Sequence, residues 1–257
     1  MGVSVSPRAS RSLPRLFALL ALVATPAWAN PEFEWLDVRR KGADAIADLG
    51  RHRTATQPWQ RAYRADVPAG HPLAGLRLVL ARAFKDRLQL SWRVAAGPKE
   101  LLGSGMVVDG AKAWLRVPGE KIKPIPQETL FRALPLLGVP WILFCALELP
   151  AHYSPAIEGE FEQVAVLRLT PRYELGVTAR PAKASISKIY GHLVAMAIND
   201  GKGTPLGEIA YLAVDKLGAP GEFNLKGPGE QAQPLRFAAD GPVTAPAKNA
   251  FSPGLLK

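Results

Sequence analysis

The clearest pattern in the chain is a two-residue alternation over residues 87–94, where apolar side chains occupy every second position between charged or polar ones. This period is typical of a β-strand with one apolar and one polar face. An apolar run over residues 76–84 precedes it, and Lys85-Asp86 between them suits a tight turn. The two segments therefore predict an antiparallel hairpin.

Similar strands follow the hairpin. Asp109-Gly110 separates strand-like runs at residues 106–108 and 112–117, and this dipeptide is a strong hairpin signal because both turn positions need positive φ. With a further run at 121–125, residues 76–125 predict a β-meander. The same reasoning predicts strands at residues 61–67, 163–170, 187–198, 206–214 and 234–238.

Three segments predict helices that would cover this sheet. Apolar residues recur at helical spacing over residues 33–50, and Gly50 is a stop signal. Residues 127–134 and 141–149 predict two short apolar helices, and the prolines between them exclude one continuous membrane span. About eight or nine strands joined mostly by short turns predict a mainly β (α+β) fold, a curved antiparallel sheet forming an incomplete β-barrel covered by short helices.

Residues 1–29 have the order of a secretory signal peptide. Arginines without acidic residues come first, an apolar core spans residues 16–24, and Ala27-Trp28-Ala29 fits a cleavage site after Ala29. The apolar core is about half of the ~20 residues that a permanent anchor needs. An uncleaved anchor and myristoylation at Gly2 are the weaker alternatives. The protein is therefore expected outside the cytoplasm, in a bacterial periplasm.

The remaining chain suits a single domain over residues 30–240. From Gly241 the sequence is rich in Pro, Ala and Gly, which predicts a flexible C-terminal tail over residues 241–257. The single cysteine, Cys145, cannot form an internal disulfide and lies in an apolar run typical of a buried thiol. The net charge of +10 is dispersed along the chain, so nucleic-acid binding is not expected.

No arrangement of residues in the sequence predicts catalysis, a metal or a cofactor. Gly103-Ser104-Gly105 lacks the first glycine of a nucleophile elbow, and no histidine has a partner at metal-ligand spacing. Apolar surface remains, and a curved sheet can hold an acyl chain on such a surface. The alternative is that the same side chains simply fill a core. The candidate cavity residues are Leu88, Leu90, Trp92, Trp114, Trp141, Phe144, Met196 and Leu212.

Three stretches resemble periplasmic outer-membrane lipoprotein-sorting proteins, the LolA/LolB-like carrier family. They are residues 81–92, residues 106–118 with their Asp-Gly hairpin and Trp114, and residues 197–208 with a Gly-x-Pro turn. The resemblance implies an incomplete β-barrel with a helical lid, and partners that are lipid or lipoprotein acyl chains, an inner-membrane exporter and an outer-membrane acceptor. Arg82 matches the family's arginine that latches the lid, although Ala83 stands where the family has proline.

Three functions are consistent with this sequence. The first is a periplasmic carrier or binding protein that shields lipid or lipoprotein acyl chains non-covalently in an apolar cavity. The second is an accessory or scaffold subunit of an envelope transport machine, which would use the same fold to bind a protein. The third is an envelope hydrolase whose site residues are distant from one another in the sequence.

Overall fold

The computed structural model describes most of the chain from Trp35 onward. The described residues are 35–53, 57–84, 87–110, 112–125, 133–141, 143, 153–172, 180–215, 217–229 and 232–257. The predicted signal peptide, Phe144 and the side chain of Leu88 lie outside them, as does most of the two predicted apolar helices.

Two helices lead into a series of strands. The helices are α1 (Trp35–Arg40) and α2 (Ala43–Arg53). The strands of the first half of the chain are β1 (Trp59–Ala65), β2 (Arg77–Phe84), β3 (Leu88–Ala96), β4 (Gly105–Asp109), β5 (Lys112–Arg116) and β6 (Lys123–Pro124). The later strands are β7 (Tyr153–Glu160), β8 (Val164–Pro171), β9 (Ala182–Ser187), β10 (Leu193–Asn199), β11 (Pro205–Val214), β12 (Pro220–Lys226) and β13 (Leu235–Ala239), and a 3-10 turn, η6 (Pro253–Leu256), follows them.

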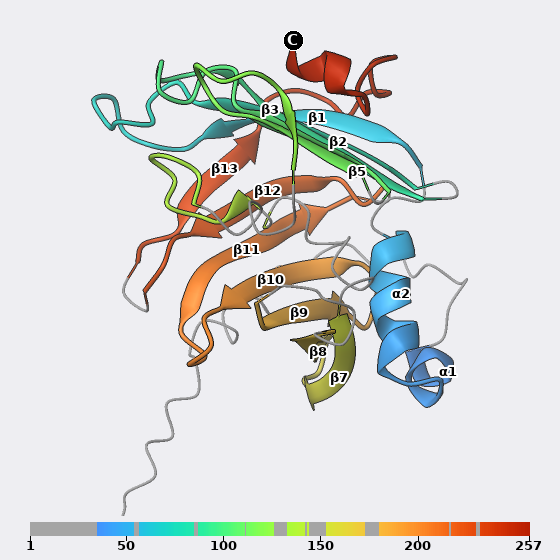
Figure 1. Ribbon diagram of the computed structural model, residues 1–257. Coiled ribbons are helices and arrows are strands. Elements are labelled where there is room, and N and C mark those ends of the chain that lie inside the picture. Colours follow the sequence, from blue (N-terminus) through green and yellow to red (C-terminus); the bar gives the residue numbers. More distant parts are fainter. Residues whose placement is uncertain are drawn as a thin grey trace, which may run out of the picture.

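The strands form one open antiparallel sheet of thirteen strands. Neighbours in the sheet are neighbours in the chain, except that β1 pairs with β13. This pairing joins an N-terminal arm, β1–β6, to a C-terminal arm, β7–β13, and leaves β6 and β7 at the two edges. Figure 1 shows the sheet curving from the N-terminal arm at the top to the C-terminal arm below. The predicted fold class is therefore confirmed.

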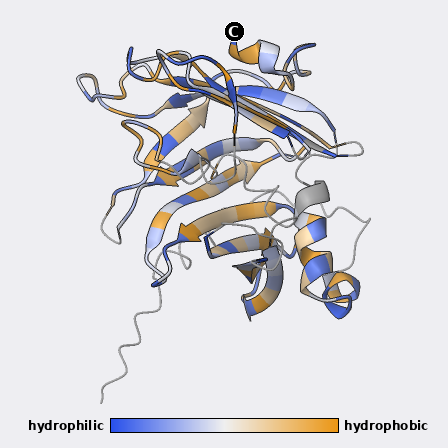
Figure 2. Ribbon diagram, in the orientation of Figure 1, coloured by the Kyte–Doolittle hydropathy of each residue, from blue (hydrophilic) through white to orange (hydrophobic). Residues whose placement is uncertain are grey.

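The register places alternate side chains of neighbouring strands on a shared face. Leu80 pairs with Trp92 and Leu78 with Val94, and all four side chains are buried. Ribbons coloured by hydropathy show the same alternation along the strands (Figure 2). One face of each arm turns inward, and we call this the concave face. The opposite face is the convex face.

The C-terminal segment 241–257, for which the composition predicts a flexible tail, packs on the convex face of the N-terminal arm. Thr244 and Gln60 exchange two backbone hydrogen bonds of 2.8 and 2.9 Å, and η6 contacts β4 and β5. Leu256 is buried, and a Cβ built on Gly105 would lie 2.8 Å from its side chain. Small residues on this face of the sheet therefore let the tail approach closely, which its composition does not reveal.

Candidate ligand site on the concave face

An aromatic cluster forms the floor of the concave face where the two arms join. Tyr63 comes from β1, Tyr211 from β11, and Phe223 and Phe237 from β12 and β13. The Phe223 ring stacks on Phe237 at 4.8 Å between centroids and meets Tyr63 edge-on at 5.0 Å. The Tyr63 hydroxyl donates a 2.8 Å hydrogen bond to the Pro220 carbonyl, and burial raises the pKa of Tyr63 far above its usual value. The cluster therefore fixes the junction of the arms with an uncharged, dry contact.

A short apolar segment enters the concave face between the arms. We call residues 133–141 with Leu143 the lid segment. It folds back on itself, with Leu134 donating a 2.7 Å backbone hydrogen bond to Val139 and a β-bridge between Ala133 and Pro140. Leu134, Val139 and Leu143 are fully buried. The segment is thus part of the core although it contributes no strand to the sheet.

The lid segment contacts both arms. The Trp141 ring lies 4.9 Å from the Trp92 ring of β3, on the N-terminal arm. On the C-terminal arm, Gly207 of β11 leaves the space that the lid occupies. A Cβ at this position would lie 2.7 Å from Pro140 and 2.9 Å from Leu143, both closer than normal contacts. The missing side chain of Gly207 is therefore what lets the lid segment seat against β11.

Helix α2 covers another part of the same face, on the C-terminal arm. It contacts β7, β9 and β10, and its Ile46 is fully buried. A Cβ at Gly50 would lie 2.5 Å from the Ile186 side chain of β9, so the helix also approaches the sheet through a glycine. Figure 1 shows α2 standing beside the ends of these strands.

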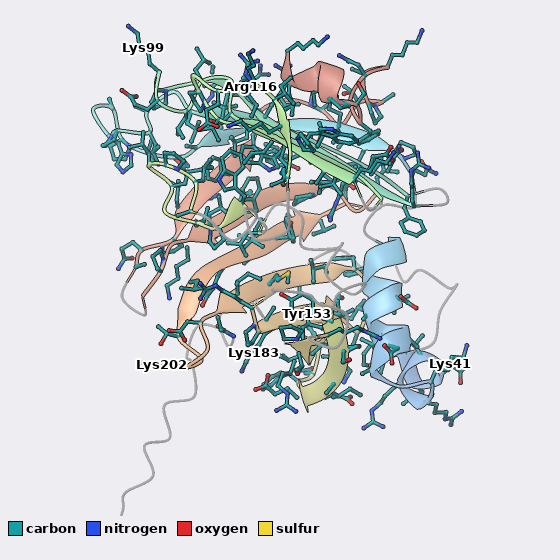
Figure 3. All side chains as sticks on the ribbon, viewed as in Figure 1. Lys41, Lys99, Arg116, Tyr153, Lys183 and Lys202 are labelled. Carbon is teal, nitrogen blue, oxygen red and sulfur yellow. The ribbon has the colours of Figure 1, made fainter. Side chains whose placement is uncertain are left out.

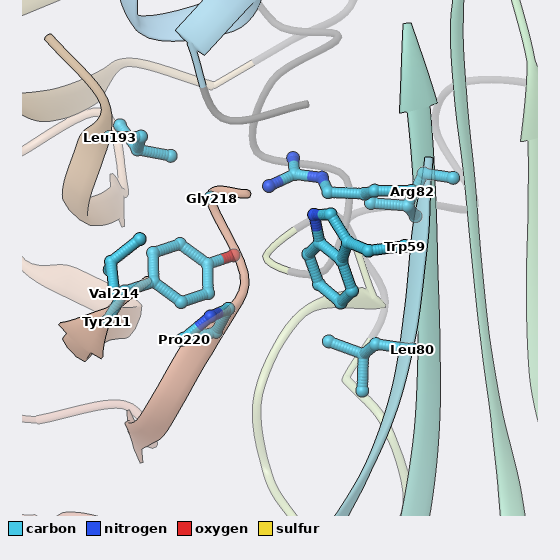
Figure 4. Close-up of a pocket in the computed structure, with 9 residues that line it drawn as sticks. Trp59, Leu80, Arg82, Leu193, Tyr211, Val214, Gly218 and Pro220 are labelled. Carbon is cyan, nitrogen blue, oxygen red and sulfur yellow. The ribbon is translucent and has the colours of Figure 1, made fainter. Parts of the chain in front are cut away.

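A cavity opens between the arms beside these covers. It is lined by Trp59, Leu80, Arg82, Leu90, Leu193, Tyr211, Val214, Gly218 and Pro220. Figure 4 shows the Arg82 guanidinium and the Trp59 indole side by side, facing Gly218 and Tyr211 across the space. Its volume is about 10 Å³, which holds about one water molecule.

Arg82 is the charged residue of this cavity. Its side chain is buried at 3 % exposure, and the eight other lining residues carry no charge. Two other charged groups near the cavity are committed elsewhere. Arg61 donates to the carbonyls of Pro220 and Gly241, and Asp215 accepts from the backbone N–H groups of Leu217 and Ala219. The described lining of the cavity is therefore apolar apart from Arg82.

The structure divides the residues that the sequence singled out. Leu90 and Arg82 line the cavity, Trp92 and Trp141 contact each other, and Met196 is buried beside Ile209, with which it pairs across β10 and β11. The other two described candidates lie elsewhere. Trp114 pairs with Val107, and Leu212 pairs with Glu222, which puts both on the convex face.

Sequence reasoning missed Trp59 and Tyr211. Side chains two apart in a strand lie on the same face, so Trp59 shares a face with Arg61 and Tyr63, and Tyr211 shares one with Ile209. Beginning the first strand at residue 61 rather than at Trp59 removed the one signal that could have found Trp59.

Charge is spread over the surface rather than gathered at the site. Lys41, Lys99, Lys183 and Lys202 project from separate parts of the molecule (Figure 3). Among the described residues, no three His, Cys, Asp or Glu side chains come together in a way that could hold a metal ion. No helix in the described ranges is long and apolar enough to cross a membrane.

Comparison with solved structures identifies the class of fold. No known family model matches the sequence, and no curated protein matches it. A LolA superfamily protein from Nitrosomonas europaea is 14% identical, covering 82% of this chain and 97% of its own, with a TM-score of 0.57. A domain described as an outer membrane lipoprotein-sorting protein from Vibrio parahaemolyticus is 13% identical, covering 84% and 98%, with a TM-score of 0.61.

A third structure agrees with these two. A DUF1329 family protein from Desulfovibrio piger is 13% identical, covering 84% of this chain and 99% of its own, with a TM-score of 0.62. At these identities the likeness establishes the fold. The chain thus has the LolA-type fold, as its resemblance to the lipoprotein-sorting carriers predicted.

Proposed function

We propose that this protein is a periplasmic carrier that shields a lipid or lipoprotein acyl chain on its concave face. The observation that carries the proposal is an apolar concave face covered by a separate lid segment that inserts between the two arms. A second support is the LolA-type fold, which it shares with a protein described as lipoprotein-sorting. A third is the predicted signal peptide, which would deliver the protein to the periplasm.

Binding requires the lid segment to move. A cavity of about 10 Å³ is far smaller than the about 300–1,000 Å³ of typical ligand pockets. The lid segment buries leucine, valine and tryptophan side chains, so its removal exposes apolar surface that an acyl chain can cover in turn. Each buried methylene contributes about 0.8 kcal/mol, and a long chain can therefore compensate for the lost lid contacts. Because the lid segment and the acyl chain would cover the same apolar surface in turn, uptake would be reversible, which a carrier requires.

The same proposal includes two partners. They are an inner-membrane exporter and an outer-membrane acceptor, which the resemblance to the lipoprotein-sorting carriers implies. Cleavage after Ala29 and a free Asn30 amino terminus are parts of this proposal.

Native mass spectrometry of the mature protein, purified from the periplasm, tests the function. We expect a bound species with the mass of a lipid or acylated peptide, and we expect the detergent-washed protein to take up a fluorescent fatty-acid probe. A washed protein that takes up no probe contradicts the carrier function. A stable protein partner in a lipid-free complex would instead support the accessory-subunit alternative.

A further inference from the structure

We propose that one end of the N-terminal arm binds the surface of an anionic membrane. This end carries the two turns that join β3 to β4 and β5 to β6, and we call it the basic end. Its residues are Arg93, Lys99, Leu102, Arg116, Lys121 and Lys123. The inference goes beyond the proposed function, because it concerns a membrane contact that needs no bound cargo.

The two arms differ in their balance of charge. Residues 59–124, which contain strands β1–β6, include twelve Lys or Arg and five Asp or Glu. Residues 153–239, which contain strands β7–β13, include nine of each. The positive charge of the sheet therefore belongs to the N-terminal arm. An uneven field of this kind turns the positive side of a protein towards an anionic surface.

Ion pairs compensate part of this excess away from the basic end. Arg64 and Arg77 both pair with Asp240, at 3.2 and 2.6 Å. At the other end of the hairpin strands, Arg87 pairs with Asp109 at 2.6 Å. These cations are held against acids, so they contribute less to binding an external anion.

The basic end itself keeps most of its positive charge. Its two acidic residues are Glu100 and Glu120, and Glu120 pairs with Lys123 at 2.8 Å. Within the described part of the chain, Lys99 and Lys121 take part in no ion pair, and both are exposed. Five cations against two carboxylates therefore leave the basic end positive.

The sheet register gathers these cations at one end. Strands β3 and β5 end where β4 and β6 begin, because neighbouring strands are antiparallel. Arg93 pairs with Gly105, and Gly105 pairs with Arg116, so the two arginines flank the glycine on the convex face. A Cβ on Gly103 would lie 3.7 Å from Cζ of Arg116, which places the first turn against it. Figure 3 shows Lys99 and Arg116 on the same side of the molecule.

An apolar side chain projects among these cations. Leu102 is 49% exposed, although the neighbouring Leu101 is fully buried. Backbone hydrogen bonds fix the turn. The Pro98 carbonyl accepts from Leu101 and Leu102, both at 3.0 Å, and the Ser104 N–H donates to the Leu101 carbonyl at 2.9 Å. The turn therefore holds Leu102 outward, and an apolar side chain beside Lys and Arg is the combination that binds a membrane interface.

A bilayer fits this surface better than an acidic protein does. An acidic protein would need carboxylates at fixed positions that match the cations, whereas mobile anionic headgroups gather around exposed lysines wherever these project. A bilayer also offers Leu102 an apolar layer beneath the headgroups. Each Lys or Arg near an anionic membrane increases binding by about fivefold, so a few cations suffice for a measurable preference.

Vesicle flotation of the purified protein tests the proposal. The vesicles contain phosphatidylcholine alone, or with about one third phosphatidylglycerol, and salt is either low or about 0.5 M. We expect the wild type to bind the anionic vesicles at least about tenfold more tightly, and to lose most of this preference at high salt. Lys99→Gln combined with Lys121→Gln should weaken anionic binding by about tenfold or more. Leu102→Ser should weaken the binding that persists at high salt.

Lys41→Gln combined with Lys202→Gln is the matched control. Both lysines are exposed and project from other parts of the molecule, and their replacement removes the same net charge (Figure 3). Binding should stay within about twofold of the wild type. An equal loss in the two double variants would show that overall net charge drives binding, and would overturn the assignment to the basic end. Equal binding of the wild type to neutral and anionic vesicles would overturn it as well.

Polyglutamate separates a membrane from an acidic protein partner. A wild type that binds polyglutamate through Lys99 and Lys121 but floats with neither kind of vesicle would assign the basic end to an acidic protein and overturn the proposal. If a double variant does not fold, the lipid preference and salt dependence of the wild type decide alone, and their absence overturns the proposal. Uptake of the fatty-acid probe is measured without vesicles, so its absence would remove the carrier function and leave the membrane contact standing.

Discussion

Two of the elements that the structure describes, helix α2 and the lid segment, cover the concave face, and they differ in how they are held. Helix α2 packs with regular hydrogen bonding, a fully buried Ile46 and a close approach of Gly50 to Ile186. The lid segment has a few backbone hydrogen bonds of its own and depends on the contacts of Trp141 and Pro140 with the two arms. Leu136 in the lid adopts a φ of 59°, a left-handed conformation that costs a leucine about 1–2 kcal/mol.

The difference indicates which cover moves. Few backbone hydrogen bonds and local strain are features of segments that open at low free-energy cost, whereas a helix is held by regular backbone hydrogen bonds along its length. We therefore assign the permanent cover to α2 and the movable one to the lid segment.

The largest expected effect is a decrease in the free energy of unfolding at acid pH, caused by the protonation of His192 near α2. His192 follows Gly191, where a Cβ would meet Leu49 of α2 at 3.0 Å, and burial lowers the pKa of His192 from 6.5 to about 4. Because the folded pKa is depressed, the unfolded chain binds the proton first as the pH falls below 6.5. Stability should therefore decrease from pH 6.5 towards pH 4, by on the order of 3 kcal/mol in total.

Urea unfolding of the wild type and of His192→Phe between pH 7 and pH 4 measures this effect. The phenylalanine keeps an aromatic ring beside Tyr190 and does not titrate, so the difference between the two proteins should shrink or reverse as the pH falls. His71→Gln serves as the control at an exposed histidine. A pH dependence that is the same in all three proteins would show that His192 does not set it. Hydrogen exchange should show earlier acid loosening of α2 than of the lid segment.

The fold was largely predictable because apolar and polar side chains alternate along most of its strands. The strands over residues 76–117 and at 163–170 and 206–214 were found nearly in place, since apolar side chains on one face are a strong signal. Strands β7, β9 and β12 were missed for physical reasons. Strand β7 contains Pro155, which is tolerated because it lies at the sheet edge, and β12 begins with Pro220-Gly221, a turn signal. Strand β9 is built from small residues with weak strand propensity.

The candidate site was predictable only in part. The periodicity of β3 correctly placed Leu90 and Trp92 on one buried face, and the family resemblance singled out Arg82. Trp114 and Leu212 are cavity candidates because they are apolar residues on predicted strands, but apolar character alone does not fix which face of a strand a residue occupies. A one-residue difference in position exchanges the two faces, so the face follows from the register with the neighbouring strand.

The second prediction concerns the contact between the lid segment and Gly207 of β11. Gly207→Val places a branched side chain where Pro140 and Leu143 now lie, while strand β11 accepts valine readily because the backbone at Gly207 does not have a positive φ. We expect the closed state to lose about 1–3 kcal/mol from overpacking and the lid segment to open more often. Uptake of the neutral fluorescent probe in stopped-flow mixing should therefore become faster.

Gly201→Ala provides the matched control, because a Cβ at that turn position meets nothing within 4 Å. Its stability and its uptake rate should match the wild type. Slower uptake in Gly207→Val, with a folded sheet by circular dichroism, would contradict the view that the lid segment limits entry.

The smallest expected effect comes from relieving the backbone strain in the lid segment rather than from displacing the segment. Leu136→Gly removes the cost of a left-handed leucine but increases the entropy of the unfolded chain, so the net gain should be less than about 1 kcal/mol. Leu102→Gly is the control, since Leu102 has nearly the same exposure, 49% against 51%, without a positive φ. That variant should lose stability. If both variants lose equally in thermal unfolding, the strain at Leu136 contributes nothing. If Leu136→Gly is more stable and also binds the neutral probe more slowly, then the backbone strain at Leu136 lowers the free-energy cost of opening the lid segment. Helix α2 has no comparable strain in its described residues.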